Sequence, residues 1–238
     1  MEVTLHNGTD PVSGKKVGLV TGDPCTFRSY EELYDAFLKQ IHYFVDMKVR
    51  VSNYIDRMFA KYAPATFLSL FIDDCIAKGK DYYNCGPRYN TSYIQCTGLG
   101  TITDSLSVLK KHVFEERKFN MEQIIHATDT NFEGQEAMQQ FILNRTPFFG
   151  NDDEYADRIA IQIFNDLYDA IEGKPNTKGE CFHLNMLSTT CHIYFGKMMN
   201  ATPNGRLAGR AISDGTSPSH GADTHGPVSY THLRAHET

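Results

Sequence analysis

Residues 187–227 read LSTTCHIYFGKMMNATPNGRLAGRAISDGTSPSHGADTHGP, and this stretch decides how the rest of the chain is interpreted. It opens inside a run, 182–194, whose alternating character and β-branched residues predict a strand. The Pro-Asn-Gly triplet at 203–205 predicts a turn, because proline presets φ and Asn-Gly tolerates positive φ. The long loop that follows is rich in Gly, Ser, Asp and His. A compact domain carries such a loop mainly where the loop walls a functional site.

Composition limits the class of protein. The chain has 238 residues, of which 41% are hydrophobic and 22% charged, as in a globular chain with a substantial core. Its net charge of −6 argues against nucleic acid or an anionic membrane as a partner. No apolar run reaches the roughly 18–20 residues that span a bilayer. Because the start of the chain shows no secretory signal, we expect a cytoplasmic protein.

The cysteines and histidines do not form a recognisable framework. No CxxC pair occurs, so we expect reduced thiols rather than disulfides. The histidines do not fall at metal-ligand spacings with the cysteines, so we expect no zinc site. The residues concerned are Cys25, Cys75, Cys85, Cys96, Cys181, Cys191, His183, His192, His220 and His225.

Most of the chain before residue 182 shows helical patterns. Ser29 and Glu32 predict a capping box that opens a long helix ending near residue 64. Further helices are expected over 67–78 with Gly79 as the cap, over 104–116 with Asp104 as the cap, from 120, over 133–144 and over 151–172. The acidic start of the last helix complements the helix dipole, whereas the alternative, a calcium loop, lacks the EF-hand spacing. Helices with a few separated strands are typical of helices around a sheet or barrel.

One glycine-rich segment allows two interpretations. Residues 96–101 read CTGLGT, a GxG within a β-favouring run, 91–103, that precedes a helix. A dinucleotide site would need a third glycine and a later acidic residue at a strand end, and neither is evident. The favoured interpretation is a strand whose glycines allow close packing against a barrel interior.

Several motifs in combination resemble one family. The chain is similar to the glycyl radical enzymes, the superfamily of pyruvate formate-lyase, from about Leu5 to Pro227. The motifs are HNG at 6–8, TGDP at 21–24, SYEEL at 29–33, FLSLFIDDCIAKGKDY at 67–82, YNCGPRYNTSYIQCTGLGTITDSL at 83–106, NFEG at 131–134, FGNDD at 149–153, PNTKG at 175–179, TPNGRLAG at 202–209, SDGTSP at 213–218 and HGADTHGP at 220–227.

The resemblance implies a fold and a domain organisation. The fold class is α/β: part of a glycyl radical enzyme α/β barrel, a mostly helical fragment with a few barrel strands. Residues 1–212 would form the C-terminal part of the barrel domain, and 213–227 the start of the glycine radical domain. Residues 228–238 break with the family, and we expect a non-native tail that packs against nothing.

The resemblance also implies radical chemistry. Such enzymes store a radical on a backbone glycine and pass it to a cysteine, whose thiyl radical abstracts a substrate hydrogen inside a closed barrel. The cysteine lies in a Gly-Cys-Val/Ile-Glu-like context and the glycine in an Arg-Val-Ala-Gly-Tyr-like loop, and this chain contains neither. We therefore expect an internal fragment that holds no catalytic residue of its own and is inactive alone.

The segments YNTSYIQ and GLGTITDSL resemble the branch that dehydrates trans-4-hydroxy-L-proline. The alternatives are another member of the family, such as a formate acetyltransferase or another C–O or C–C lyase, and an inert scaffold fragment. The resemblance implies a small-molecule substrate, a homodimer and no bound cofactor. An activating enzyme that uses S-adenosylmethionine and an iron–sulfur cluster would install the glycyl radical in the full-length enzyme.

One residue of this chain is implied to contact substrate. The resemblance places a substrate-binding threonine at Thr189. If the run 182–194 is a strand, Thr189 points into the barrel while Ser188 and Thr190 face the other way. The alternative is a hydroxyl satisfied by neighbouring backbone groups.

Overall fold

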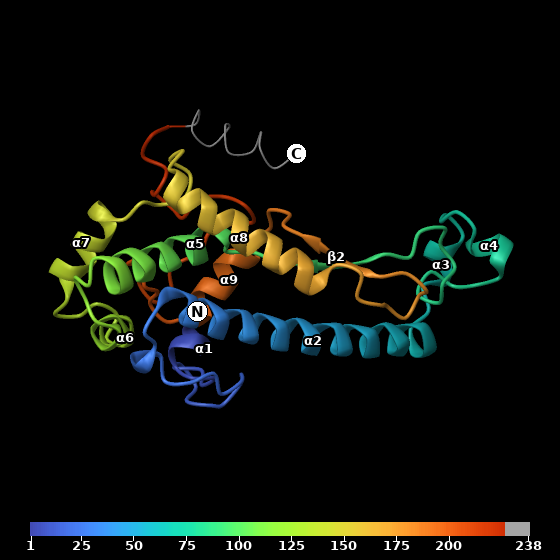
Figure 1. The fold of residues 1–238 in the computed structure, drawn as a ribbon. Helices are drawn as coiled ribbons and strands as arrows, with labels where there is room; N and C mark the ends of the chain where they lie inside the picture. The colour runs from blue at the N-terminus through green and yellow to red at the C-terminus, as the bar shows by residue number, and fades with distance from the viewer. Residues whose placement is uncertain (227–238) are drawn as a thin grey trace. The chain divides into compact units, whose positions relative to one another are not determined.

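The computed structural model describes residues 1–226, which are mostly helical with one pair of short strands (Figure 1). The elements are α1 (Glu2–Leu5), a 3₁₀ turn (Pro24–Thr26), α2 (Tyr30–Tyr62), α3 (Thr66–Ser69), α4 (Cys75–Lys78), β1 (Ser92–Gln95), α5 (Leu99–Val108), a π-helical segment (Leu109–Glu115), α6 (Met121–Asp129), α7 (Glu136–Arg145), α8 (Glu154–Ile171), β2 (Phe182–Asn185) and α9 (Cys191–Met198). The expected tail at 228–238 lies outside the described residues. No helix among residues 1–226 is both long and apolar enough to cross a membrane.

The chain forms two compact units. Unit 1 comprises residues 1–40, 96–166 and, among the described residues, 186–226. Unit 2 comprises residues 41–95 and 167–185. Both α2 and α8 contribute residues to each unit.

The core of unit 1 is built around α5 and its π-helical continuation. Leu106, Val108 and Leu109 have no measurable exposure, and Val108 and Leu109 belong to one hydrophobic cluster with Ile124 of α6 and Ile142 of α7. Burying a side chain of this size contributes about 1.5–3 kcal/mol, so these positions fix α5 at the centre of the unit.

The start of α6 is set by a local capping box. Asn120 Oδ1 accepts from the Gln123 N–H at 2.8 Å, and Gln123 Oε1 accepts from the Asn120 N–H at 2.9 Å. These bonds satisfy backbone donors that the first helical turn leaves open. The prediction that Asn120 and Gln123 open this helix is confirmed.

Unit 2 contains the strand pair. β1 and β2 are parallel, with Tyr93 opposite His183 and Ile94 opposite Leu184. Ile94 and Phe182 are buried, whereas the rings of Tyr93 and His183 lie 5.8 Å apart and remain partly exposed. Successive side chains of a strand point to opposite faces, so the pair has one buried face and one that carries Tyr93 and His183.

Four of the secondary-structure predictions need correction. The strand expected from the run 91–103 ends at Gln95, and Gly100 lies in α5 rather than on a strand. The helix expected from Asp104 begins at Leu99, which places Asp104 inside α5. The helix expected over 67–78 is two short helices separated by residues 70–74, where Asp74 has a φ of 74°, although Gly79 does cap the second. The strand expected over 182–194 ends at Asn185, and Cys191–Met198 form α9 instead. Strand propensity depends on packing context, and here the packing overrides it.

Candidate functional site

The residues after α9 form a loop that docks on unit 1, and we call residues 211–226 the docked loop. Its start is held by the N-terminal end of α5. The Thr101 N–H donates to Ser213 Oγ at 3.0 Å, and the Ser213 N–H donates to Thr101 Oγ1 at 2.8 Å. The Thr97 hydroxyl donates to the Ser213 carbonyl at 3.3 Å. Because Thr101 and Ser213 are buried, leaving either one unpaired would be costly.

The middle of the docked loop is held by a buried carboxyl. Asp104 has no exposed surface and accepts from the Phe149 N–H at 2.8 Å and from the Ser219 hydroxyl at 2.5 Å. Burial raises the pKa of Asp104 to about 7, although both hydrogen bonds favour the charged form. Asp104 therefore joins α5, the turn before α8 and the docked loop at one point.

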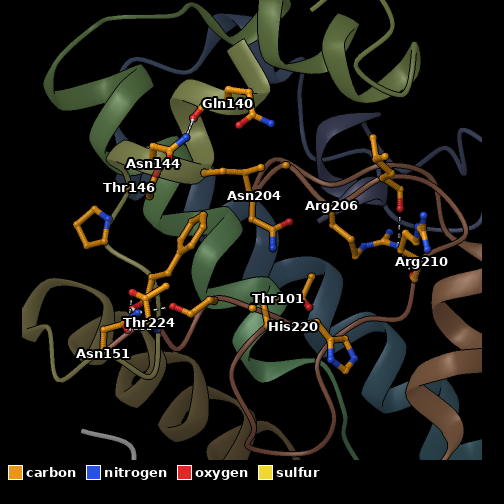
Figure 2. Close-up of a pocket in the computed structure, with 18 of the residues that line it drawn as sticks. Thr101, Gln140, Asn144, Thr146, Asn151, Asn204, Arg206, Arg210, His220 and Thr224 are labelled. Carbon is orange, nitrogen blue, oxygen red and sulfur yellow. Dashed lines mark hydrogen bonds between the residues drawn. The ribbon is translucent and has the colours of Figure 1, made fainter. Parts of the chain in front are cut away.

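The end of the docked loop is held by Asn151. Its side-chain oxygen accepts from the N–H groups of Thr224 at 2.8 Å and His225 at 3.1 Å. Its side-chain nitrogen donates to the Ala222 carbonyl at 2.7 Å. One amide therefore satisfies three backbone groups of the last described turn (Figure 2).

Three glycines let residues 210–218 pack closely against α5, the turn before α8 and α9. A Cβ on Gly100 would lie 2.6 Å from the Ser217 carbonyl oxygen. A Cβ on Gly150 would lie 2.3 Å from Pro218 Cγ, and a Cβ on Gly196 would lie 2.2 Å from the Arg210 carbonyl oxygen. Real side chains do not come so close, so these contacts require glycine.

A cavity of about 940 Å³ lies beside the docked loop within unit 1. Figure 2 shows polar side chains around it, among them Gln140 and Asn144 from α7, Asn204 from the 203–205 turn, and His220 from the docked loop. The guanidinium of Arg206 also lines the cavity but already donates to the carbonyls of Leu207 and Asn200. Apolar side chains such as Leu143 and Phe148 also line the cavity, so its wall is mixed in character.

Thr189 lies in the turn between β2 and α9, outside the lining of this cavity. Its N–H donates to Asp214 Oδ1 at 3.0 Å, and its carbonyl accepts from His192 Nδ1 at 2.7 Å. Its hydroxyl accepts from the Cys191 N–H at 3.3 Å. Since position 189 is not on a strand, the alternation argument for its orientation is wrong. A substrate contact by Thr189 stays a prediction.

A model of the pyruvate formate lyase-like family matches residues 1–196. The chain belongs to this family. The docked loop follows the matched residues and packs on α5 and the turn before α8, which lie inside the match.

Relatives with similar sequences are much longer than this chain. The trans-4-hydroxy-L-proline dehydratase of Clostridioides difficile is 51% identical over 228 residues, which cover 96% of this chain and 29% of that protein. The isethionate sulfite-lyase of Oleidesulfovibrio alaskensis is 37% identical over 236 residues, which cover 96% of this chain and 28% of that protein. The chain therefore spans under a third of the length of these relatives.

Solved structures show the fold. The glycerol-bound B12-independent glycerol dehydratase of Clostridium butyricum superposes with a TM-score of 0.91 at 33% identity, covering 98% of this chain and 29% of that one. A glycyl radical enzyme of Archaeoglobus fulgidus gives a TM-score of 0.90 at 29% identity, with the same coverage. The expected α/β fold, part of a glycyl radical enzyme barrel, is confirmed.

Other candidate groups of this pyruvate formate lyase-like chain are the cysteines and the acidic segment at the start of α8. The six cysteines are thiols, and burial raises the pKa of the Cys96 thiol to about 11. The acidic segment starts α8, where Asp153 Oδ1 accepts from the Tyr155 N–H at 2.9 Å. Within the described part of the chain, no group of His, Cys, Asp and Glu side chains is arranged to hold a metal ion.

Sequence reasoning missed the residues that hold the docked loop. Asp104 and Asn151 occur inside motifs that resemble the family, but no contact was assigned to them. Asp104 instead appeared to be a helix cap, because Asp is a common N-cap residue. The available signal was that Asp104 and Asn151 lie in the motifs CTGLGTITDSL and FGNDD, which resemble the same family as the SDGTSP motif of the docked loop.

Proposed function

We propose that this chain is part of a longer radical dehydratase that removes water from trans-4-hydroxy-L-proline. The supporting observation is the difference in identity over the same 96% of the chain: 51% to a protein named for this activity, against 37% to an isethionate sulfite-lyase. A C–S lyase or another member of the family is the alternative. Within such an enzyme, this chain would supply barrel strands, surrounding helices and the frame that holds the docked loop.

The remaining parts of the proposal concern the longer protein. The radical cysteine and glycine would lie outside these 238 residues, and an activating enzyme that uses S-adenosylmethionine and an iron–sulfur cluster would install the radical. We also propose that the longer protein is a cytoplasmic homodimer. In this reaction, hydrogen abstraction beside the C–OH bond precedes loss of the hydroxyl, whose departure an acid assists.

Thr189 would take part by binding the substrate. Its backbone is fixed by Asp214 and His192, so its position is well defined. A hydroxyl that accepts one hydrogen bond, here from the Cys191 N–H, keeps its proton for a second partner. A carboxylate or hydroxyl of the substrate would satisfy that donor.

The experiment is a segment exchange. Residues 1–226 replace the matching segment of the Clostridioides difficile trans-4-hydroxy-L-proline dehydratase, and the chimera is activated and assayed for dehydration of trans-4-hydroxy-L-proline. A second chimera with the isethionate sulfite-lyase is assayed on isethionate. Electron paramagnetic resonance measures the glycyl radical in both, so a failure of activation is separated from a failure of catalysis.

We expect the first chimera to dehydrate trans-4-hydroxy-L-proline and the second to lose its activity on isethionate, because each substrate needs its own barrel residues. If the first chimera carries a full radical signal but does not turn over, the substrate assignment is wrong. Activity of the second chimera on isethionate would favour the C–S lyase.

A further inference from the structure

A thiol of unit 2 has a base beside it. Cys181 is half-buried, and its Sγ lies 3.5 Å from Nε2 of His183, two residues along the chain. The backbone of Cys181 is fixed because its carbonyl accepts from the Ser92 N–H at 3.0 Å and because it bridges to Pro175. A thiol within hydrogen-bond reach of an imidazole can transfer its proton when an electrophile approaches.

A carboxylate orients the base. Nδ1 of His183 contacts Glu172 Oε1, and the second oxygen of Glu172 accepts from the Leu184 N–H at 3.4 Å. A carboxylate against Nδ1 requires the proton on that nitrogen, which leaves Nε2 as the acceptor that faces the thiol. The Tyr93 ring, 5.8 Å from the imidazole, packs beside it. The arrangement is therefore nucleophile, base and orienting acid.

The group is reachable by small molecules. The side chains of His183 and Glu172 are 32% and 25% exposed, and Cys181 is likewise only partly covered. A buried thiol such as Cys75 would be shielded, and an exposed one such as Cys25 has the carboxylate of Asp23 rather than an imidazole beside it. Local desolvation and then Asp23 raise the pKa of the Cys25 thiol, which keeps it protonated.

We propose that Cys181 is a reactive thiol and a covalent modification site for small soft electrophiles, with His183 as its base and Glu172 as the positioning residue. In the reaction with an alkyl iodide, the sulfur forms a bond to carbon, the carbon–iodine bond breaks, and iodide leaves. The thiol proton passes to Nε2 of His183 and from there to solvent. This site is separate from the proposed dehydratase activity and does not depend on it.

The experiment measures the alkylation of each cysteine by iodoacetamide. The 238-residue protein is treated at neutral pH, quenched at intervals and digested, and the peptides that contain Cys181 and Cys25 are quantified by mass spectrometry. We expect Cys181 to react on the order of tenfold faster than Cys25 although it is less exposed, because His183 can accept the thiol proton as the sulfur–carbon bond forms. Concentrated urea abolishes the difference, since it separates Cys181 from its base.

Matched variants test the two partners. His183→Gln keeps a polar side chain but removes the base, and the Cys181 rate should fall to about that of Cys25 while the Cys25 rate stays unchanged. Glu172→Gln should lower the alkylation rate at Cys181 by less than His183→Gln does. Far-UV circular dichroism checks that each variant is folded.

The wild-type protein tests the proposal even if a variant does not fold. In the wild-type protein at neutral pH, the rate at Cys181 should exceed the rate at Cys25, and concentrated urea should remove the excess. A Cys181 rate equal to or below that of Cys25 in the folded protein would overturn the proposal. So would a folded His183→Gln variant with an unchanged Cys181 rate. Neither result bears on the segment exchange, because alkylation needs no radical and no turnover.

Discussion

Asp104 shows how one residue can join distant segments. It lies inside α5, yet its hydrogen-bond partners, Phe149 and Ser219, are 45 and 115 residues further along the chain. Complete burial disfavours the charged carboxylate more than the two donors stabilise it, which is why its pKa rises to about 7. The protonation state of Asp104 therefore affects the stability of unit 1.

We expect the wild-type protein to lose stability relative to Asp104→Asn as the pH rises from about 4 to about 7. A raised pKa means that the folded protein keeps a proton that the unfolded chain releases. The stabilisation is full below the unfolded pKa and is lost as the pH passes the folded pKa, with a total on the order of a few kcal/mol. Urea unfolding at several pH values measures the difference between the two proteins.

The control is Asp35→Asn, which removes an exposed carboxylate paired with Lys39. It should change the free energy of unfolding by no more than about 1 kcal/mol and leave its pH dependence almost unchanged. An Asp104→Asn protein with the same pH slope as wild type would show that another group is responsible.

Thr189→Val tests the proposed substrate contact in the intact enzyme. Valine keeps the shape of threonine and removes the hydroxyl. We expect kcat/KM to fall by an amount on the order of 1–3 kcal/mol in transition-state binding. Thr190→Val is the control, because Thr190 is exposed and its side chain does not cap α9. Unchanged kcat/KM in a fully activated Thr189→Val enzyme would leave the hydroxyl with a local structural role only.

At the level of elements, the docked loop depends on the surface of α5. Thr101 and Asp104 supply side-chain partners, and Gly100 supplies the space for the Ser217 carbonyl. These three positions lie within about one turn and a half of the helix, since a turn takes about 3.6 residues. The N-terminal part of α5 is therefore both part of the core and the docking surface for the loop.

Gly100→Ala should destabilise the protein. Helix propensity alone would favour alanine by about 1 kcal/mol. Because its Cβ would lie 2.6 Å from the Ser217 carbonyl oxygen, we expect instead a loss of about 1–3 kcal/mol. Amide hydrogen exchange at Ser213 and Ser219 should speed up, since the docked loop must move away from α5.

Gly134→Ala is the comparison for this prediction. An added Cβ there meets nothing within 4 Å, although φ is +70°. The substitution should introduce backbone strain of about 1 kcal/mol and leave hydrogen exchange in the docked loop unchanged. If the amides of the docked loop are equally protected from hydrogen exchange in both variants, the close packing of Gly100 against the Ser217 carbonyl is not what holds the loop.

At the level of the whole molecule, the 238-residue chain covers only 29% of a relative with dehydratase activity in its name. None of its cysteines has the neighbours expected of the radical cysteine. We therefore expect no dehydration of trans-4-hydroxy-L-proline by this chain alone, even with an activating enzyme present. Electron paramagnetic resonance of the treated chain should show no glycine-centred doublet, and such a doublet would contradict the fragment interpretation.

The sequence by itself determined the elements whose signals are local. The start of α2 follows from Ser29, which accepts from the Glu32 N–H at 3.3 Å, and α6 follows from its capping box. α8 follows from its acidic first turn and apolar periodicity. A cap acts within three or four residues, so its effect can be read without knowledge of the rest of the chain. The motifs also determined the family.

Only the tertiary structure decided what happens after β2 and where the docked loop lies. The β-branched run continues to residue 194, but the chain leaves the strand at Asn185 and forms α9, whose Gly196 packs against the Arg210 carbonyl. The contacts between Ser213 and Thr101 join residues 112 positions apart. Propensity describes only a residue and its near neighbours, whereas burial and hydrogen bonding between distant segments select among the conformations that propensity allows.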